Sequence, residues 1–314
     1  MAGFIIRRVL NLIPVAFVVL LVTFSLIHIA PGNPAYTILG DQASKSAVQL
    51  LDRKMGLNRP LVVQFLTYLN QVIHGNLGRS LLDNEPVASL IVTRLPVTLE
   101  LSVLAIALSL AVALPIGVLA AYHANTWVDS LSRVLALIGA AVPNFWLALL
   151  LVYVFAVSLR WLPSLGWVPL NQGVGQNLEH LILPVVVLAL PLIATTSRVL
   201  RGTLIEVLHL LYIQVARAKG LQERTVVLRH GFKNALIPVV TVVGMQVGLL
   251  LGGVVITESI FSLPGMGQLV VDAIFDRDYM VLQGSVLFMA MAVLLANLIV
   301  DLCYAWLDPR IRYN

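Results

Sequence analysis

Ionisable side chains inside long apolar segments are the residues of this chain that could do chemistry. Four of them stand in or beside such segments, namely His28, Glu100, Glu258 and Asp301. An acid or imidazole within a membrane can relay protons or bind cations, so each is a candidate for function. All four lie close to the expected ends of apolar segments, where water lowers the cost of a charge. We therefore expect structural or interfacial roles for them. The lack of an acid near the middle of a segment argues against a proton-coupled carrier.

Motifs for catalysis and metal binding are absent from the sequence. No G-x-x-x-x-G-K-[ST] phosphate loop occurs, and the only lysine next to a glycine is Lys219, which precedes Gly220. No H-E-x-x-H, paired-cysteine or G-x-S-x-G pattern occurs either. Cys303 is the only cysteine, so there is no internal disulfide. We expect a chain that is not an enzyme, does not hydrolyse ATP and holds no cofactor or metal.

The composition indicates an all-α integral membrane protein. Of 314 residues, 59% are hydrophobic and only 11% are charged, and the mean hydropathy is +0.94. Soluble domains carry about 25% charged residues, so lipid is the natural solvent for this chain. The net charge of +5 suggests basic residues facing the cytosol rather than nucleic-acid binding, because no nucleic-acid motif accompanies it.

About six apolar runs are long enough to cross a bilayer. The first is expected to stay as a helix rather than be cleaved as a signal peptide. The fourth is the weakest, because it is short and contains two prolines that would kink it. The runs are Val9–Ile29, Leu99–Tyr122, Val134–Leu159, Leu181–Thr196, Leu236–Thr257 and Val281–Tyr304.

Basic residues gather on one side of this arrangement. Arg7, Arg8, Arg133, Arg310 and Arg312 fall on the same side as the strongly basic segment 197–235. The excess of Lys and Arg in short cytoplasmic loops places both termini and this segment in the cytosol. The expected organisation is an N-terminal membrane helix (1–30), an extracytoplasmic region (31–98) and a five-helix core (99–314) that includes the cytosolic loop 197–235.

The extracytoplasmic region is too long for a simple connector and should hold helices of its own. Pro60 opens one amphipathic helix, and Pro86–Leu95 forms a second that Pro96 closes. The region is either a cap on the membrane surface, which its composition favours, or a docking surface for an extracytoplasmic partner. In the second case Gln64 and Arg79 are expected to face that partner.

Three glycines recur every four residues in the fifth run, at Gly244, Gly248 and Gly252. This spacing lets another helix approach closely. Packing inside the subunit and a subunit interface or moving contact are equally compatible with it. Gln246 lies on a different face and either lines a polar path or bonds a neighbouring helix.

The cytosolic loop 197–235 is long enough for two helices. In the first, Leu204, Leu208, Leu211, Val215 and Ala218 share one face, and Gly220 ends the helix after a basic last turn. A second, basic helix over Glu223–Asn234 leads into the fifth run. The first helix could lie on anionic lipid. Its small side chains, Ala216, Ala218 and Gly220, instead favour insertion into the cleft of a partner.

Several motifs together resemble one family, that of the inner-membrane permease subunits of ATP-binding-cassette importers, in the dipeptide, oligopeptide and nickel group. The single long loop after the first span is similar to the first of the two permeases in such systems. The matching stretches are Arg94–Leu101, Tyr212–Leu221, Arg229–His230, Asn234–Pro238, Thr257–Gly267 and Asp308–Arg310.

The resemblance implies that Gln214–Gly220 is the coupling helix that docks in a groove of the ATPase. Gln214 and Val215 replace the Glu and Ala of the general importer motif, and Pro238 lies further downstream than is usual. These departures leave the docking role of the helix in place. The residues expected to couple to the ATPase are Tyr212, Gln214, Ala216, Arg217, Ala218, Lys219, Gly220 and Arg224.

The resemblance also implies the partners and the setting. These are a second permease subunit, two ATPase subunits, an extracytoplasmic solute-binding protein and the lipid of a bacterial inner membrane. Peptides are the expected cargo, with nickel or glutathione as the alternative within the same class. An ion-coupled carrier, an intramembrane enzyme and a structural scaffold are the competing classes.

Overall fold

The computed structural model describes residues 2–29, 34–39 and 43–307, and this part of the chain contains helices but no strand. The prediction of an all-α fold is therefore confirmed for these residues. The helices are α1 (Ala2–Ile29), α2 (Pro34–Leu39), α3 (Lys45–Met55), α4 (Leu61–Ile73), α5 (Val87–Tyr122), α6 (Trp127–Ala141), α7 (Asn144–Leu151), η1 (Val152–Ser158), η2 (Leu170–Gln172), α8 (Val174–Leu208), α9 (Leu211–Ala218), α10 (Glu223–Thr225), η3 (Val226–Gly231), α11 (Phe232–Gly253), α12 (Val255–Phe261), α13 (Met266–Phe275) and α14 (Tyr279–Leu307).

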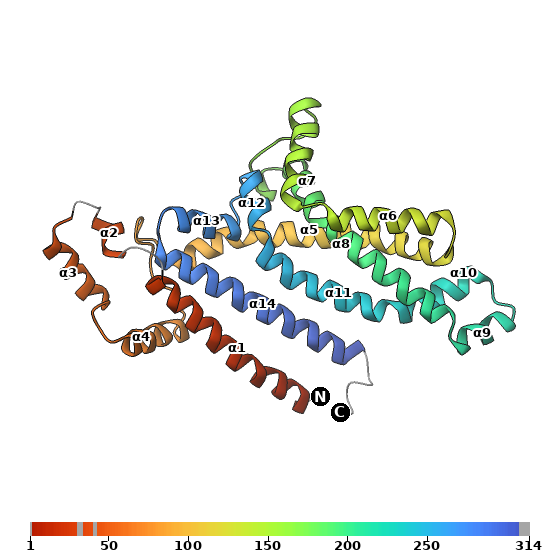
Figure 1. Cartoon of the computed structure of the whole chain (residues 1–314), viewed down its shortest axis with the longest axis horizontal. Coiled ribbons are helices and arrows are strands. Elements are labelled where there is room, and N and C mark those ends of the chain that lie inside the picture. The colour runs from red at the N-terminus through yellow and green to blue at the C-terminus, as the bar shows by residue number, and fades with distance from the viewer. Residues whose placement is uncertain (1, 30–33, 40–42, 308–314) are drawn as a thin grey trace.

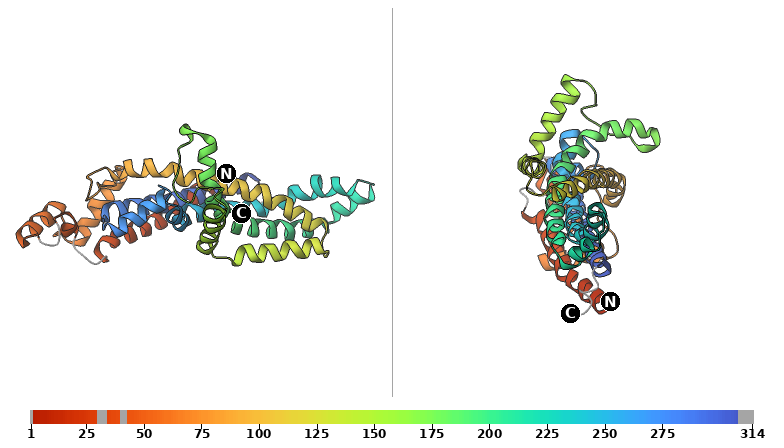
Figure 2. Two further views of the ribbon diagram at one scale, coloured as in Figure 1. Left: turned by 90° about the horizontal axis from the view of Figure 1, so that it is seen from above. Right: turned by 90° about the vertical axis from the view of Figure 1, so that its right-hand side faces the viewer.

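Long helices run side by side and form an elongated bundle (Figures 1 and 2). α5 packs along α8, α11 packs against both α8 and α14, and α1 lies along α14. Helices α2–α4 sit at one end of the long axis, and α9 and α10 sit at the other (Figure 1). The bundle therefore has two ends, each built from short helices and joined by long ones.

Small residues let α5 and α8 approach closely. Ala105, Ser109, Ala113 and Gly117 recur every four residues along α5, and all are buried. A Cβ on Gly117 would lie 3.0 Å from the side chain of Leu200 on α8. Close packing of small residues is a main source of helix association in membranes, where burial of apolar surface adds little.

Four helices of the described chain are long and apolar enough to cross a membrane, and a fifth crosses if α6 and α7–η1 count as one span. The run predicted at Val134–Leu159 is divided between two helices, because α6 and α7–η1 meet at a bend of 98°. Val142 has extended backbone angles and precedes Pro143, a residue that disfavours helical geometry in its predecessor. As a result α7 stands away from the bundle (Figures 1 and 2).

One proline that was expected to end a helix does not end it. The predicted helix end at Pro96 is wrong, because α5 continues through it, and the predicted boundary at residue 98 falls inside this helix. Val97 and Thr98, the next two residues, are both only 1% exposed. Their packing favours continuation of the helix despite the missing proline N–H.

The helix that contains the fourth predicted run is much longer than that run. α8 extends through Pro184 and Pro191 to Leu208. The first residues of the predicted cytosolic loop, from Ser197 onward, are therefore helical, and the loop begins near His209. By contrast, α1 and α14 contain the whole of the first and sixth predicted runs. The C-terminal motif Asp308–Arg310 lies outside the described residues.

Candidate functional site

The short helix α9 forms the tip of the end opposite α2–α4 (Figure 1). It follows Leu210, whose backbone is extended, and it stops before Gly220, whose φ is +77°. The Gly220 N–H donates to the Arg217 carbonyl at 2.9 Å, and the Leu221 N–H donates to the Ala216 carbonyl at 3.4 Å. This left-handed stop is the one predicted, and glycine adopts it at low cost.

The inner face of α9 packs on the subunit itself. Ile213 is fully buried and Ala216 is 8% exposed, and both join a core cluster with Leu204, Leu208 and Val226. The predicted apolar face that ran unbroken from Leu204 to Ala218 is therefore wrong. The chain turns at His209 and Leu210, so α9 presents a different set of residues to the core than α8 does.

The outer face of α9 is open to its surroundings. Leu211 is 75% exposed and Val215 is 46% exposed, and Ala218 is also exposed. Tyr212, Gln214 and Lys219 border this apolar strip and are exposed as well. We call Leu211, Gln214, Val215, Ala218 and Lys219 the outer face of α9. Of the small residues expected at the tip, Ala218 and Gly220 lie at the surface and Ala216 does not.

A hydrogen-bonded tyrosine holds α9 against the start of α11. The Tyr212 hydroxyl donates to the His230 carbonyl at 3.3 Å and accepts from Asn234 Nδ2 at 2.6 Å. Both partners belong to the motif stretches Arg229–His230 and Asn234–Pro238. Tyr212 therefore fixes the angle at which α9 leaves the bundle.

An ion pair closes the turn that follows α9. Arg217 donates from Nη2 to Glu223 Oε1 at 2.6 Å and from Nε to Glu223 Oε2 at 3.0 Å. The same side chain donates to the Leu208 carbonyl at 3.3 Å. The hydrogen bond with Glu223 raises the pKa of Arg217 above its ordinary value, so the guanidinium stays charged. Arg217 thus stabilises the turn after α9, whereas Arg224 is exposed.

Glu258 has a more structured environment than its sequence position suggests. It was expected near water at a helix end, and this is wrong, because the residue is fully buried. Its Oε1 accepts from Thr98 Oγ1 at 2.6 Å, and its Oε2 accepts from the N–H groups of Gly267 at 2.7 Å and Gln268 at 3.1 Å. Thr98 Oγ1 also accepts from the Met266 N–H at 2.8 Å. The expected structural role fits this network.

The other ionisable candidates make local contacts. Glu100 Oε2 accepts from Trp167 Nε1 at 3.1 Å, and His28 Nε2 lies 3.1 Å from Gln64 Oε1 in a hydrogen bond. Asp301 lies in α14, but its side chain is outside the described part of the structure.

The glycines of α11 pack within the subunit. A Cβ on Gly244 would lie 2.2 Å from Val300 on α14, and one on Gly248 would lie 3.2 Å from Asn297 Oδ1. Gly252 lies in α11 as well. Gln246 is buried and its Nε2 bonds Thr196 Oγ1 at 3.2 Å on α8. Of the alternatives left open above, packing inside the subunit holds for Gly244 and Gly248, and bonding to a neighbouring helix holds for Gln246.

The two residues expected to face an extracytoplasmic partner differ in their surroundings. Gln64 Nε2 donates to the carbonyls of Leu57 at 2.9 Å and Arg59 at 2.8 Å, and it thereby fixes the α3–α4 turn. Arg79 donates to the Asn84 carbonyl at 2.9 Å but remains exposed. Arg79 is the better placed of the two to meet a partner.

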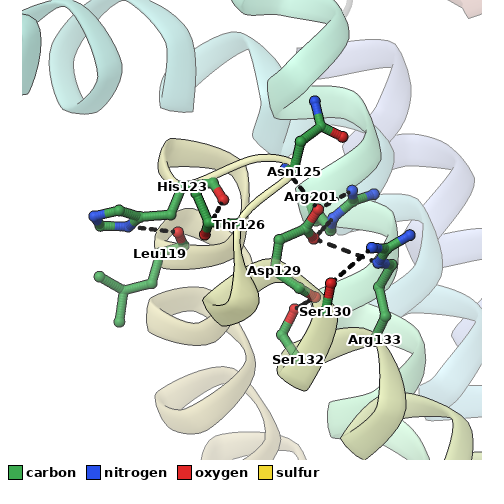
Figure 3. Close-up of polar contacts among 9 residues, drawn as sticks. All are labelled: Leu119, His123, Asn125, Thr126, Asp129, Ser130, Ser132, Arg133 and Arg201. Atoms are coloured by element: carbon green, nitrogen blue, oxygen red, sulfur yellow. Dashed lines mark hydrogen bonds and ion pairs between the residues drawn. The ribbon is translucent and has the colours of Figure 1, made fainter.

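A buried ion pair that was not predicted ties α6 to α8 near the α9 end (Figure 3). Asp129 is fully buried and accepts from both Nε and Nη2 of Arg201, the latter at 2.7 Å. The Asn125 N–H donates to the same carboxylate at 3.0 Å, and Arg133 Nε lies 3.7 Å from it. The isolated acid in the apolar segment Trp127–Ala141 was the signal in the sequence that could have revealed this contact.

Comparison with known proteins covers the whole chain. Residues 113–313 match the family described as the inner membrane component of binding-protein-dependent transport systems, and residues 1–102 match its N-terminal domain. The dipeptide transport system permease protein of Alkalihalophilus pseudofirmus is 41% identical over 100% of both chains. A Brucella abortus protein described as a peptide transport system permease is 44% identical, and the glutathione transport system permease protein of Escherichia coli is 39% identical, again over 100% of both chains. The chain therefore belongs to the family of inner-membrane permease components of binding-protein-dependent transport systems.

Proposed function

We propose that this chain forms half of the translocation path of a peptide importer in a bacterial inner membrane and that α9 docks in a cleft of the ATPase that drives it. The observation that carries the coupling role is the outer face of α9. Its apolar strip is exposed on a helix that Tyr212, Arg217 and Gly220 hold in a defined position. An apolar face that is exposed and already ordered favours binding of a partner, because binding then costs little conformational entropy.

The small and uncharged side chains of the outer face of α9 fit a protein cleft better than a lipid surface. Lys219 and Arg224 border α9, while its contact positions include the uncharged Gln214 and the small Ala218. A lipid-binding helix carries bulky apolar groups along its whole buried face. Here the inner face is already occupied by the subunit's own core.

The two ends of the bundle support the expected sidedness. The segment from α9 to η3 carries Arg217, Lys219, Arg224 and Arg229, and this end faces the cytosol by the positive-inside rule. The end with α2–α4 then faces outward and meets the solute-binding protein. Arg79, in the segment between α4 and α5, is exposed and available to this partner. Both termini are cytosolic in this arrangement.

The complete importer would contain a second, different permease, two ATPase subunits and a solute-binding protein. ATP-driven closure of the ATPases would move α9 and, through its contacts with α8 and α11, rock the two permease halves between inward-open and outward-open states. Hydrolysis belongs to the ATPase subunits and not to this chain.

Peptides are the proposed cargo, because the relatives at 41% and 44% identity are named for dipeptide or peptide transport. Glutathione, itself a tripeptide, is the second candidate, supported by the relative at 39% identity. The two are separated by uptake of labelled dipeptide and labelled glutathione in cells that carry the complete system.

The decisive experiment places a bulky side chain on the outer face of α9. Ala218→Trp should abolish co-purification of the ATPase and peptide uptake, because the indole prevents close approach. Ala88→Trp is the matched control for ATPase co-purification, which it should leave unchanged, since Ala88 is an exposed alanine in the first turn of α5 at the far end of the bundle. Normal ATPase recovery and uptake with Ala218→Trp would refute the docking role of α9.

A further inference from the structure

A cavity lined by three arginines lies between α5, α6 and α8. It has a volume of about 300 Å³. Arg133 on α6 and Arg198 and Arg201 on α8 supply its charge, and Ile116, Ala120 and Leu137 are among its apolar lining residues. It is separate from the outer face of α9 and plays no part in the coupling proposed above.

The charges of this cavity are not balanced. Within the described part of the chain, Asp129 is the one carboxylate that pairs with these arginines, and both of its oxygens accept from Arg201 (Figure 3). Arg133 is 53% exposed, and its Nε stays 3.7 Å from Asp129. The hydrogen bond described for Arg198 is a long one of 3.4 Å to the Ala136 carbonyl. Three guanidinium groups and one carboxylate give the site a net positive charge. Some of the guanidinium N–H groups are therefore available as donors to a ligand.

Exposed aromatic side chains flank the loop between α5 and α6, close to the cavity along both helices. Trp127 is 75% exposed at the start of α6 and Tyr122 is 48% exposed at the end of α5, and such aromatic rings mark the membrane interface. Six residues further along α6, about 9 Å at 1.5 Å per residue, comes Arg133. Beyond it Val134, Leu137 and Ile138 expose apolar side chains suited to an acyl chain.

From this geometry we infer that the cavity binds the phosphodiester of an anionic phospholipid. Arg133 and Arg198 donate to the phosphate oxygens, Arg201 adds charge while remaining bound to Asp129, and one acyl chain follows the exposed face of α6. Guanidinium groups suit phosphate because they offer paired donors in one plane. Basic pockets between membrane helices on the cytoplasmic side are suited to such headgroups. A lipid bound here would brace α6 against α8.

The test is lipid retention by the full-length chain. The chain is reconstituted in nanodiscs with equal phosphatidylglycerol and phosphatidylcholine, released, and analysed by native mass spectrometry. The wild type should retain phosphatidylglycerol selectively. Arg198→Gln and Arg133→Gln should each lower that retention about fivefold, the contribution expected of one basic residue near anionic lipid. Arg198→Lys keeps the charge but loses the paired donors, so its retention should fall between those of the wild type and Arg198→Gln.

Controls make each result decisive. Arg229→Gln removes an exposed arginine at the same end of the bundle, outside the cavity, and should retain phosphatidylglycerol as the wild type does. Arg201 is left intact because its loss would leave the buried Asp129 unpaired. Equal retention of both lipids by the wild type, or unchanged retention in Arg198→Gln, would overturn the assignment.

A second arm separates lipid from free phosphate. Titration of the chain in neutral detergent with inorganic phosphate should show no saturable binding that depends on Arg198. Saturable, Arg198-dependent binding of phosphate that displaces phosphatidylglycerol would overturn the lipid assignment and make the cavity a site for a soluble anion.

Discussion

The hydroxyl of Thr98 donates a 2.6 Å hydrogen bond to the buried carboxylate of Glu258, a residue 160 positions later in the chain. The bond joins α5 to α12. The second oxygen of the same carboxylate accepts from the N–H groups of Gly267 and Gln268 in the first turn of α13. One buried acid thus organises the meeting of three helices, and it compensates the free donors and positive dipole of a helix start.

Replacing this acid should lower stability in a graded way. Glu258→Ala leaves Thr98 and two backbone N–H groups without an acceptor, and we expect a loss of about 3 kcal/mol in the free energy of unfolding. Glu258→Gln keeps one acceptor and should cost less, about 1–2 kcal/mol. Thermal and denaturant unfolding in detergent measures both. Glu206→Ala, at an exposed carboxylate in the last turn of α8, is the control. Equal stability of Glu258→Ala and the wild type would contradict the proposed role of the network.

Gly244 should not tolerate a methyl group, because a Cβ there would lie 2.2 Å from Val300 Cγ1. We expect Gly244→Ala to cost about 1–3 kcal/mol through overpacking. Val300→Ala should relieve much of this cost in the double variant, so the two substitutions would not add. Gly248→Ala is the comparison within the same helix, and it should cost less, because its nearest contact is 3.2 Å away. Additive effects at Gly244 and Val300 would show that their contact does not decide the packing.

Asp129 offers a test of two ion pairs on one carboxylate. Asp129→Asn should cost about 3 kcal/mol, because Arg201 is only 21% exposed and loses a charged partner. Arg133→Gln should cost less than about 1 kcal/mol, because that side chain is 53% exposed and lies 3.7 Å from the carboxylate. Denaturant unfolding of both variants under one set of conditions gives the comparison. Equal costs would mean that the burial of the Arg201 pair confers no advantage.

Tyr212 and Asn234 should act as a unit in holding α9. Tyr212→Phe and Asn234→Ala each remove the 2.6 Å hydrogen bond between them. We expect faster amide hydrogen exchange in residues 211–221 in both variants, with little change in global stability, because the bond is exposed and local. The double variant should resemble the more severe single variant. Exchange confined to other regions would show that α9 is held by its buried face alone.

Two substitutions of Gly220 distinguish the effect of backbone geometry on α9 from the effect of direct contact with the partner. Asn tolerates the left-handed conformation, so Gly220→Asn should keep α9 in place. Gly220→Val should strain the stop by about 1–2 kcal/mol and fray the end of α9, although a Cβ at this position would meet nothing within 4 Å in the chain. Hydrogen exchange of residues 211–221 together with ATPase co-purification distinguishes the two. Loss of ATPase with Asn but unchanged exchange would show instead that the partner contacts Gly220 directly.

The sequence predicted most helices and missed most of their contacts. Apolar length was sufficient for α1, α11 and α14, because a helix in lipid satisfies its own backbone and needs only a long apolar run. The glycine stop at Gly220 was also predictable, since it is a local property of the backbone. By contrast, α5 continues through Pro96 and α6–α7 breaks at Pro143. The same residue type had opposite effects at these two positions: the residues after Pro96 are buried in the bundle, whereas Val142 before Pro143 is extended.

The sequence by itself determined that this chain is a helical membrane protein with a basic, glycine-terminated segment between its fourth and fifth long apolar segments. Those properties follow from composition, run length and local backbone preference, all of which act over a few residues. Only the tertiary structure decided which face of α9 is open, that Gly244 meets Val300, and that Asp129 and Glu258 are buried with partners 72 and 160 positions away. Such contacts depend on where distant helices come to lie, and the polarity of single residues leaves that undetermined.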